Sequence, residues 1–187
     1  MLAERFSAQL ATKLLPRSEY RPYPTVDDRE AWNDLPERLR AERIEQAEQY
    51  LNWDWPSLPA TLFMEYARSG NRSNYEKNHF ARRTALGVLV VAECIEDEGR
   101  FIDDIINGIW AICEESFWGV PAHKVVRDPL PNVQEPVIDL FAAETGGLLS
   151  WTLYLLENRL VNQSPLLVDR MRCEMRRRIL DPYLERD

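Results

Sequence analysis

The sequence predicts an all-α protein built from antiparallel helix hairpins. Apolar residues recur at helical spacing, and no segment shows sustained alternation of apolar and polar residues. Only 7 of the 187 residues are glycine. Strongly charged helical stretches alternate with nearly all-apolar ones, which indicates a solvated outer layer packed on a buried inner layer. We expect residues 1–187 to form a single helical domain.

The composition narrows the classes of partner. Hydrophobic residues make up 45% and charged residues 29%, which is the balance of a globular protein with a sizeable core. The formal net charge of -8 argues against nucleic acid as a partner, because phosphate backbones attract basic surfaces. Two histidines exclude most multi-histidine metal sites. The chain has no glycine-rich phosphate loop and no histidine–carboxylate metal motif, so we expect neither a metal nor a cofactor.

The cysteines and the apolar runs bear on the compartment. The three cysteines, Cys94, Cys113 and Cys173, are an odd number without a CxxC pair, and we expect the first two to be buried. No apolar run approaches the ~18–20 residues that span a bilayer, and the first residues lack a signal-peptide pattern. We therefore expect no membrane association. The expected location is cytoplasmic in this form, or periplasmic or secreted if a signal peptide has been removed.

Four short elements are expected in the first part of the chain. Leu2, Phe6, Leu10 and Leu14 recur at helical spacing up to Pro16. Residues 27–28 cap a turn that ends near residue 32. A charged outer helix covers residues 37–52, and a further helix covers residues 60–68 and ends at Gly70.

Four longer helices are expected in the rest of the chain. The first covers residues 74–97, is apolar almost all round from residue 85 to 95, and stops at Gly99. The second covers residues 100–117. A loop over residues 119–136 with four prolines leads to a nearly all-apolar helix over residues 137–157. The last covers residues 165–180, with Pro165 in its first turn and several arginines that favour a solvated outer helix.

The helix over residues 100–117 carries a polar face that is typical of sugar binding. At 100° per residue, the five side chains of this face fall within an arc of about 80°, opposite an aliphatic side. Aromatic rings stack on the C–H surfaces of sugars, while carboxylates and amides bind hydroxyls. The alternative is an amphipathic helix whose tryptophans pack against a neighbour. The face consists of Asp103, Asn107, Trp110, Glu114 and Trp118.

Two further positions are candidates for function. His123 opens the proline-rich loop and is suited to act as a general acid, a general base or a hydrogen-bond donor, with a structural hydrogen bond as the alternative. Glu144 lies in an otherwise apolar helix, so we expect it to pair with a neighbouring segment or to line a cavity. Next to it, Gly146 and Gly147 favour close approach of another segment. For Arg72 we expect an ion pair with a helix carboxylate rather than an anion site.

Eight strings, taken in order, resemble the N-terminal helical region of heparinase II/III-like polysaccharide lyases. The resemblance covers nearly the whole chain, and the order of the strings is more specific than any one of them. The strings are LPRSE (15–19), DREAW (28–32), LPAT (58–61), GNR (70–72), GRF (99–101), IWAICEES (109–116), WGVPAH (118–123) and DLFAAET (139–145).

The resemblance implies a fold and an activity. The family has an (α/α) toroid followed by a β-sandwich, of which this chain resembles about the first half of the toroid. Members cleave uronic-acid-containing polysaccharides by β-elimination. An asparagine or histidine stabilises the enolate, and a tyrosine or histidine moves the protons. Those residues lie later in family members, so we assign no catalytic residue here and expect the chain to be inactive alone. The substrate-contacting positions implied for this chain are Trp110, Glu114, Trp118, His123 and Glu144.

Two other functions remain open at this stage. In the first, the chain would be a stand-alone helical module that binds carbohydrate or another partner. In the second, it would belong to a toroid glycoside hydrolase with Glu114 and Glu144 as paired carboxylates. The negative net charge does not match a protein that binds acidic sugars, because such a protein is expected to offer basic groups to its ligand. Half of a ring leaves an inner face uncovered, so we also expect self-association if the chain is part of a larger toroid.

Overall fold

The described part of the chain is helical. In the computed structural model, residues 14–16, 19–124 and 127–185 are described, and no strand occurs among them. The prediction of an all-α fold is therefore confirmed. The helix expected from Leu2 to Leu14 lies, apart from its last residue, outside the described residues.

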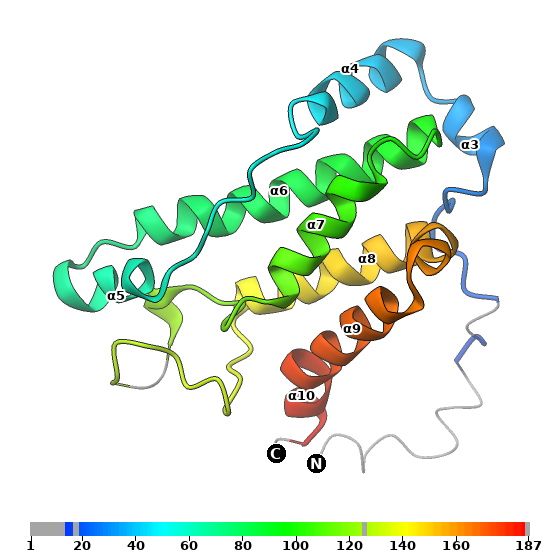
Figure 1. Ribbon diagram of the computed structural model, residues 1–187. Helices are drawn as coiled ribbons and strands as arrows, with labels where there is room; N and C mark the ends of the chain where they lie inside the picture. Colours follow the sequence, from blue (N-terminus) through cyan, green and yellow to red (C-terminus); the bar gives the residue numbers. More distant parts are fainter. Residues whose placement is uncertain (1–13, 17–18, 125–126, 186–187) are drawn as a thin grey trace.

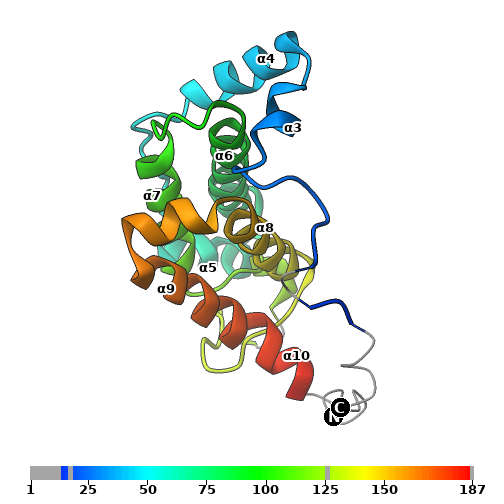
Figure 2. The ribbon, with the colours of Figure 1, turned by 90° about the vertical axis from the view of Figure 1, so that its right-hand side faces the viewer.

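Two long helix hairpins form the body of the protein. The first consists of α6 (Ser73–Glu96) and α7 (Ile102–Cys113), and the second of α8 (Leu140–Gln163) and α9 (Pro165–Met175). Figure 1 shows that the two helices of each pair run in opposite directions. Helix α6 packs against α8, and α7 packs against α9. The hairpins therefore lie side by side, with α6 and α8 in one layer and α7 and α9 in the other, as Figure 2 shows almost end-on.

Shorter elements cover the two ends of the first hairpin. Helices α3 (Arg29–Asn33) and α4 (Glu37–Glu48) lie near the carboxyl end of α6. In α4, Ala47 is buried and Leu39 and Ile44 are partly buried. The chain then runs back along α6 to α5 (Ala60–Ser69), which contacts α6 and the 3₁₀ helix η1 (Pro121–His123). This return segment, residues 49–59, passes α7 and delivers Trp55 to the middle of the hairpin.

Several predicted helix ends are confirmed by the backbone. Helix α5 ends at Gly70, whose φ of 77° is a conformation that glycine adopts without strain. Helix α6 ends at Asp97, with Gly99 at a φ of 79° shortly after it. Helix α8 begins later than predicted because Asp139 caps it, accepting a hydrogen bond from the amide of Ala142 at 2.7 Å.

The predicted helix over residues 100–117 is too long at its carboxyl end. Helix α7 ends at Cys113, and the chain turns so that the indole of Trp118 donates a hydrogen bond to the carbonyl of Ile112 at 2.9 Å. The same carbonyl also accepts from the backbone amide of Glu115 at 3.2 Å, so two donors satisfy it at the end of the helix. Trp118 is thereby drawn inward instead of continuing the polar face of α7.

The last helical stretch is also more buried than predicted. After α9, the π-helix η2 (Arg176–Leu180) precedes α10 (Asp181–Glu185). Within η2, Arg178 is buried and bonds Glu174 at 2.6 Å, while its guanidinium lies over the ring of Trp118 at 4.9 Å. The prediction of a purely solvated outer helix is wrong for this position, because a stretched turn brings the arginine onto the core.

The core lies between the two layers. Each large apolar side chain in it contributes about 1.5–3 kcal/mol when fully buried. Cys94 and Cys113 are buried in this core, as predicted, and Cys173 is exposed. The largest fully buried aliphatic side chains of the core include Leu86, Leu89, Ile105, Ile109, Ile112, Leu149, Leu156, Leu160 and Met171.

Gly108 permits the closest contact between the return segment and α7. A Cβ built there would lie 2.3 Å from Cη2 of Trp55, so the indole sits where a side chain would be. Gly146 and Gly147 were both expected to allow close approach of another segment. A Cβ built at Gly146 would lie 3.1 Å from Cγ1 of Ile179, which confirms the prediction there, whereas Gly147 faces open space.

Substitution by alanine at Gly108 and at Gly147 should have opposite effects on the free energy of unfolding. Gly108→Ala should lower the free energy of unfolding by up to about 2 kcal/mol, because overpacking costs about 1–3 kcal/mol and the gain in helix propensity is only about 1 kcal/mol. Gly147→Ala should raise it by up to about 1 kcal/mol. Urea unfolding measures both, and equal effects of the two substitutions would contradict the packing of Trp55 on Gly108.

Candidate functional site

A buried carboxylate held by two arginines lies where α7 ends. Glu115 has a side chain only 2% exposed. Its Oε1 accepts from Nη1 of Arg82 at 3.0 Å and from Nη1 of Arg83 at 2.7 Å, and its Oε2 accepts from Nη2 of Arg83 at 2.6 Å. Such charge-assisted bonds compensate for the loss of hydration of all three groups.

The two arginines connect this carboxylate to the rest of the fold. Arg82 also donates to the carbonyl of Pro56 at 2.7 Å and to that of Ala111 at 2.9 Å. Arg83 also donates to the hydroxyl of Thr145 at 3.1 Å. The cluster therefore joins α6 to the return segment, to α7 and to α8.

His79 lies one turn before Arg83 on α6, and its backbone carbonyl accepts from Nη1 of Arg83 at 3.1 Å. It is fully buried, and neither ring nitrogen is paired among the described residues. Its Nδ1 lies 3.8 Å from Oε2 of Glu115, which is too long for a hydrogen bond. Burial, followed by the positive charges of Arg83 and Arg82, lowers its pKa to about 2, so the imidazole is neutral.

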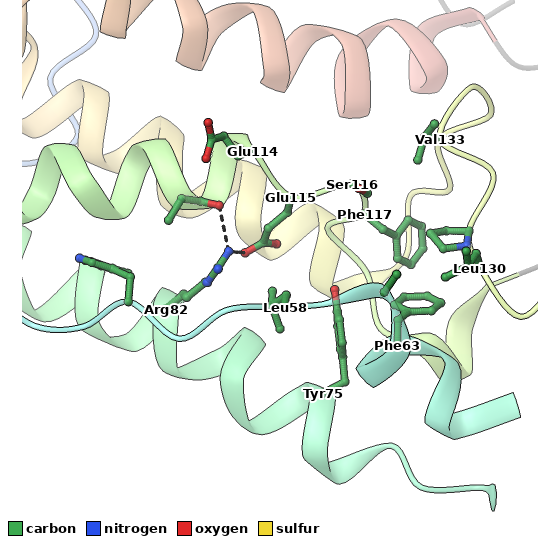
Figure 3. A pocket seen from close by; sticks show the side chains of 14 residues that line it. Leu58, Phe63, Tyr75, Arg82, Glu114, Glu115, Ser116, Phe117, Leu130 and Val133 are labelled. Atoms are coloured by element: carbon green, nitrogen blue, oxygen red, sulfur yellow. Dashed lines mark hydrogen bonds and ion pairs between the residues drawn. The ribbon is translucent and has the colours of Figure 1, made fainter. Parts of the chain in front are cut away.

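A pocket of about 340 Å³ opens beside this cluster. Figure 3 shows it between α6, the end of α7 and the loop that follows η1. One part of its wall is aromatic and aliphatic, and the other is polar, which is the usual makeup of a small-ligand site. The apolar wall includes Trp55, Leu58, Phe63, Phe117, Leu130 and Val133, and the polar wall consists of Tyr75, Arg82, Glu114, Glu115 and Ser116.

The polar groups of this wall that make no bond to the described residues include the hydroxyl of Tyr75 and Nη2 of Arg82. Tyr75 is 4% exposed, and its hydroxyl, which Figure 3 shows pointing into the pocket, has no hydrogen-bond partner among the described residues. Burial and the nearby charge of Glu115 raise the pKa of Tyr75, so its hydroxyl remains a donor. On Arg82, the bonds in the described part of the chain use Nε and Nη1 and leave Nη2 without an acceptor.

The predicted polar face of α7 is present only in part. Asp103, Asn107, Trp110 and Glu114 are exposed on one side of the helix and its end, and the isoleucines are buried on the other. Trp110 is 46% exposed and donates to Glu114 at 2.8 Å, and the guanidinium of Arg170 lies 5.6 Å from its ring centroid. Glu114 lines the pocket, whereas Trp110 does not.

The prediction for Trp118 is wrong in its placement. Its side chain is 2% exposed and belongs to the core, because α7 ends before it and the chain turns inward. It does not line the pocket beside Glu115.

The other two candidates lie elsewhere on the molecule. His123 makes the structural hydrogen bond that was its alternative: Nδ1 lies 2.8 Å from Oδ2 of Asp139, and the ring stacks on Phe141. Glu144 is exposed on α8, which corrects the expectation of a paired or cavity-lining carboxylate. The buried face of that helix passes through Ala142 and Thr145 instead. Glu144 does not line the pocket that holds Glu114, and sugar binding by these positions stays a prediction.

The ion pair expected of Arg72 is confirmed. Its Nε donates to Glu76 at 2.6 Å, within the first turn of α6.

The buried cluster was not identified from the sequence, although a signal was present. Glu115 lies 100° around the helix from Glu114, toward the aliphatic side, where an unpaired carboxylate is costly. Arg82 and Arg83 stand just before the most apolar stretch of the same hairpin. A buried carboxylate opposite two adjacent arginines is the pattern that predicts an ion-pair cluster.

Comparisons add no assignment to this geometry. No family model matches the chain, and no curated protein matches it significantly. Within residues 14–16, 19–124 and 127–185, no group of three or more histidine, cysteine or acidic side chains is placed to hold a metal ion. Among the helices of these residues, none is long and apolar enough to cross a membrane.

Because His79 is buried and neutral, the free energy of unfolding should decrease as the pH is lowered. In the unfolded chain a histidine takes up a proton below about pH 6.5, whereas in the folded protein His79 does so only near about pH 2. Between these values the unfolded state binds the extra proton, so stability is lost as the pH falls. From about pH 7 to about pH 5, this residue should cost about 2 kcal/mol.

The comparison variant is His79→Phe, which keeps a ring but cannot be protonated. Urea unfolding across this pH range should show a shallower loss of stability for the variant than for the wild type. Parallel curves for the two proteins would show that the imidazole is not held neutral.

Proposed function

We propose that this chain is the N-terminal helical part of a heparinase II/III-like polysaccharide lyase that acts on uronic-acid-containing polysaccharides by β-elimination. In this proposal the chain binds and positions the saccharide. No residue of the chain is assigned to proton transfer, in line with the expectation that it is inactive alone.

The observation that carries the proposal is the pocket beside Glu115. Its volume of about 340 Å³ lies within the range of small-ligand sites. Aromatic rings such as Phe63 and Phe117 suit the C–H faces of a sugar, while Tyr75, Glu114 and Ser116 suit its hydroxyls.

The resemblance supports the same place in the fold. The string at residues 109–116 contributes Glu114, Glu115 and Ser116 to the pocket, and the string at residues 58–61 contributes Leu58 and Ala60. Two strings that are far apart in the sequence thus meet around one pocket, which is where we propose that the polysaccharide binds.

The paired-carboxylate alternative has less support. A hydrolase needs two carboxyl groups facing one glycosidic bond, and Glu144 does not line the pocket that contains Glu114. We therefore favour the lyase.

Calorimetry on the purified chain tests the proposal. The panel consists of unsulfated oligosaccharides that contain glucuronate, iduronate, mannuronate, guluronate or galacturonate, with a neutral cello-oligosaccharide beside them. We expect at least one uronate oligosaccharide to bind more tightly than the neutral one. Incubation with the chain alone should produce no unsaturated product absorbing in the near ultraviolet.

A matched pair of variants locates the binding. Val133 lies exposed on the pocket wall and Val161 lies exposed on α8, outside it. Val133→Asp should weaken uronate binding by up to about fivefold, because like charges in water repel by about 1 kcal/mol when about 4 Å apart and by less at longer range. Val161→Asp should leave binding unchanged. Equal effects of the two, or a panel that does not bind at all, would contradict the proposal.

A further inference from the structure

A second, smaller hollow adjoins the pocket and is bordered by two arginines. It shares Ser116, Phe117 and Val133 with the pocket and has a volume of about 20 Å³. This volume holds one water-sized group, such as one oxygen atom of a larger ion. Of the charged side chains in the described part of the chain, only Arg177 and Arg178 line it. Its other lining residues are Trp118, Asn132, Pro136, Val137 and Ala142.

Positive charges outnumber negative charges beside this hollow, because three arginines share the carboxylate of Glu174. Arg177 and Arg178 donate to its Oε2 at 2.7 and 2.6 Å. Nε of Arg170 lies 3.2 Å from its Oε1. Among the described residues, no other carboxylate forms an ion pair with any of the three arginines. Two positive charges are therefore left without a paired counter-charge, and such a surplus attracts anions.

The carboxylates of the neighbouring segments do not line the hollow. Glu115 is held by the arginines of α6, and Asp139 caps α8. Asp181 pairs with Arg176, and Glu135 is exposed on the loop. The residues that border the hollow therefore carry only positive charge, in a chain whose net charge is -8.

Both lining arginines keep donors that other residues do not use. The bonds of Arg177 to the described residues use Nη2, and those of Arg178 use Nε and, at 3.4 Å, Nη2, so Nη1 of each is unoccupied. Arg178 is held in place by Glu174 and by the ring of Trp118. Guanidinium groups bind oxyanions through several N–H donors at once, and a group that is already held loses little freedom on binding.

The turn that carries these arginines is unusual in its backbone. Arg177 and Arg178 lie in the π-helix η2, and the next residue, Ile179, packs on Gly146 of α8. π-Helical turns are rare and occur frequently at functional sites. The backbone is thus a second indication, independent of charge, that this segment binds a ligand.

We propose that this hollow binds one inorganic oxyanion of the phosphate or sulfate type, with one oxygen inside the hollow and the others at its mouth. Arg177 and Arg178 donate to the anion and take up its charge. This inference does not depend on the proposed function, because neither arginine lines the pocket assigned to the saccharide.

Thermal unfolding of the 187-residue chain tests the proposal, with sodium sulfate and sodium phosphate as probes. The reference is sodium chloride of equal ionic strength, which screens charges to the same extent. At about 10 mM, each oxyanion should raise the unfolding midpoint by about 2–4 °C relative to chloride, because a ligand that binds only the folded state stabilises it.

Two adjacent arginines supply a matched pair of variants. Arg177→Gln removes a lining guanidinium that is half exposed and leaves Glu174 paired with its two other arginines, so the variant should fold and lose at least half of the shift. Arg176→Gln makes the same change of charge one residue earlier, outside the hollow, and should keep the full shift.

A second pair changes the wall without removing an arginine. Val133→Asp places a negative charge at the hollow and should also reduce the shift, whereas Val161→Asp on α8 should not. Loss of the shift in Arg177→Gln and Val133→Asp alone supports the proposal. A midpoint that responds equally to oxyanion and chloride overturns it. Equal shifts in the members of each pair also overturn it, since the ions then act on the protein as a whole.

Discussion

The ion-pair cluster of Glu115 with Arg82 and Arg83 is the interaction on which the positions of the neighbouring segments depend. The three side chains come from the two arms of the first hairpin, and their remaining bonds reach the return segment through Pro56 and α8 through Thr145. Replacing such a cluster by apolar groups is often neutral, but removing one member leaves a buried charge unpaired. The cluster therefore specifies which segments meet, more than it adds to total stability.

The pocket follows from this constraint. Arg82 bonds Glu115 and bridges the carbonyl of Pro56 in the return segment to that of Ala111 in α7. Tyr75 and Phe117 then line the space that remains. The charged side chains that line the pocket are one guanidinium group, Arg82, and two carboxylates, Glu114 and Glu115.

Most helices could be predicted from local sequence signals. The features that could not be predicted depend on contacts between residues far apart in the sequence. Gly70 and the apolar stretch before Gly99 mark helix ends through backbone conformation and periodicity alone. The placement of Trp118 depends on an indole bond to Ile112 that ends α7 early, and nothing in the helical spacing indicates it. The apolar neighbours of Glu144 in the sequence predict a buried carboxylate, whereas its own face of α8 is exposed. Predicting the site would require knowing that Glu115 pairs with Arg82 and Arg83, about thirty positions earlier, and a single sequence does not reveal such a pairing.

The most direct test of the central constraint compares two adjacent glutamates. Glu115→Gln removes the charge that holds both arginines, whereas Glu114→Gln alters an exposed neighbour whose carboxylate accepts from Trp110 and from no other side chain in the described part of the chain. Urea unfolding should show a loss of about 3 kcal/mol or more for Glu115→Gln, because the buried guanidinium of Arg82 and the partly buried one of Arg83 lose their counter-charge. It should show no more than about 0.5 kcal/mol for Glu114→Gln. Equal and small losses for both variants would contradict the account.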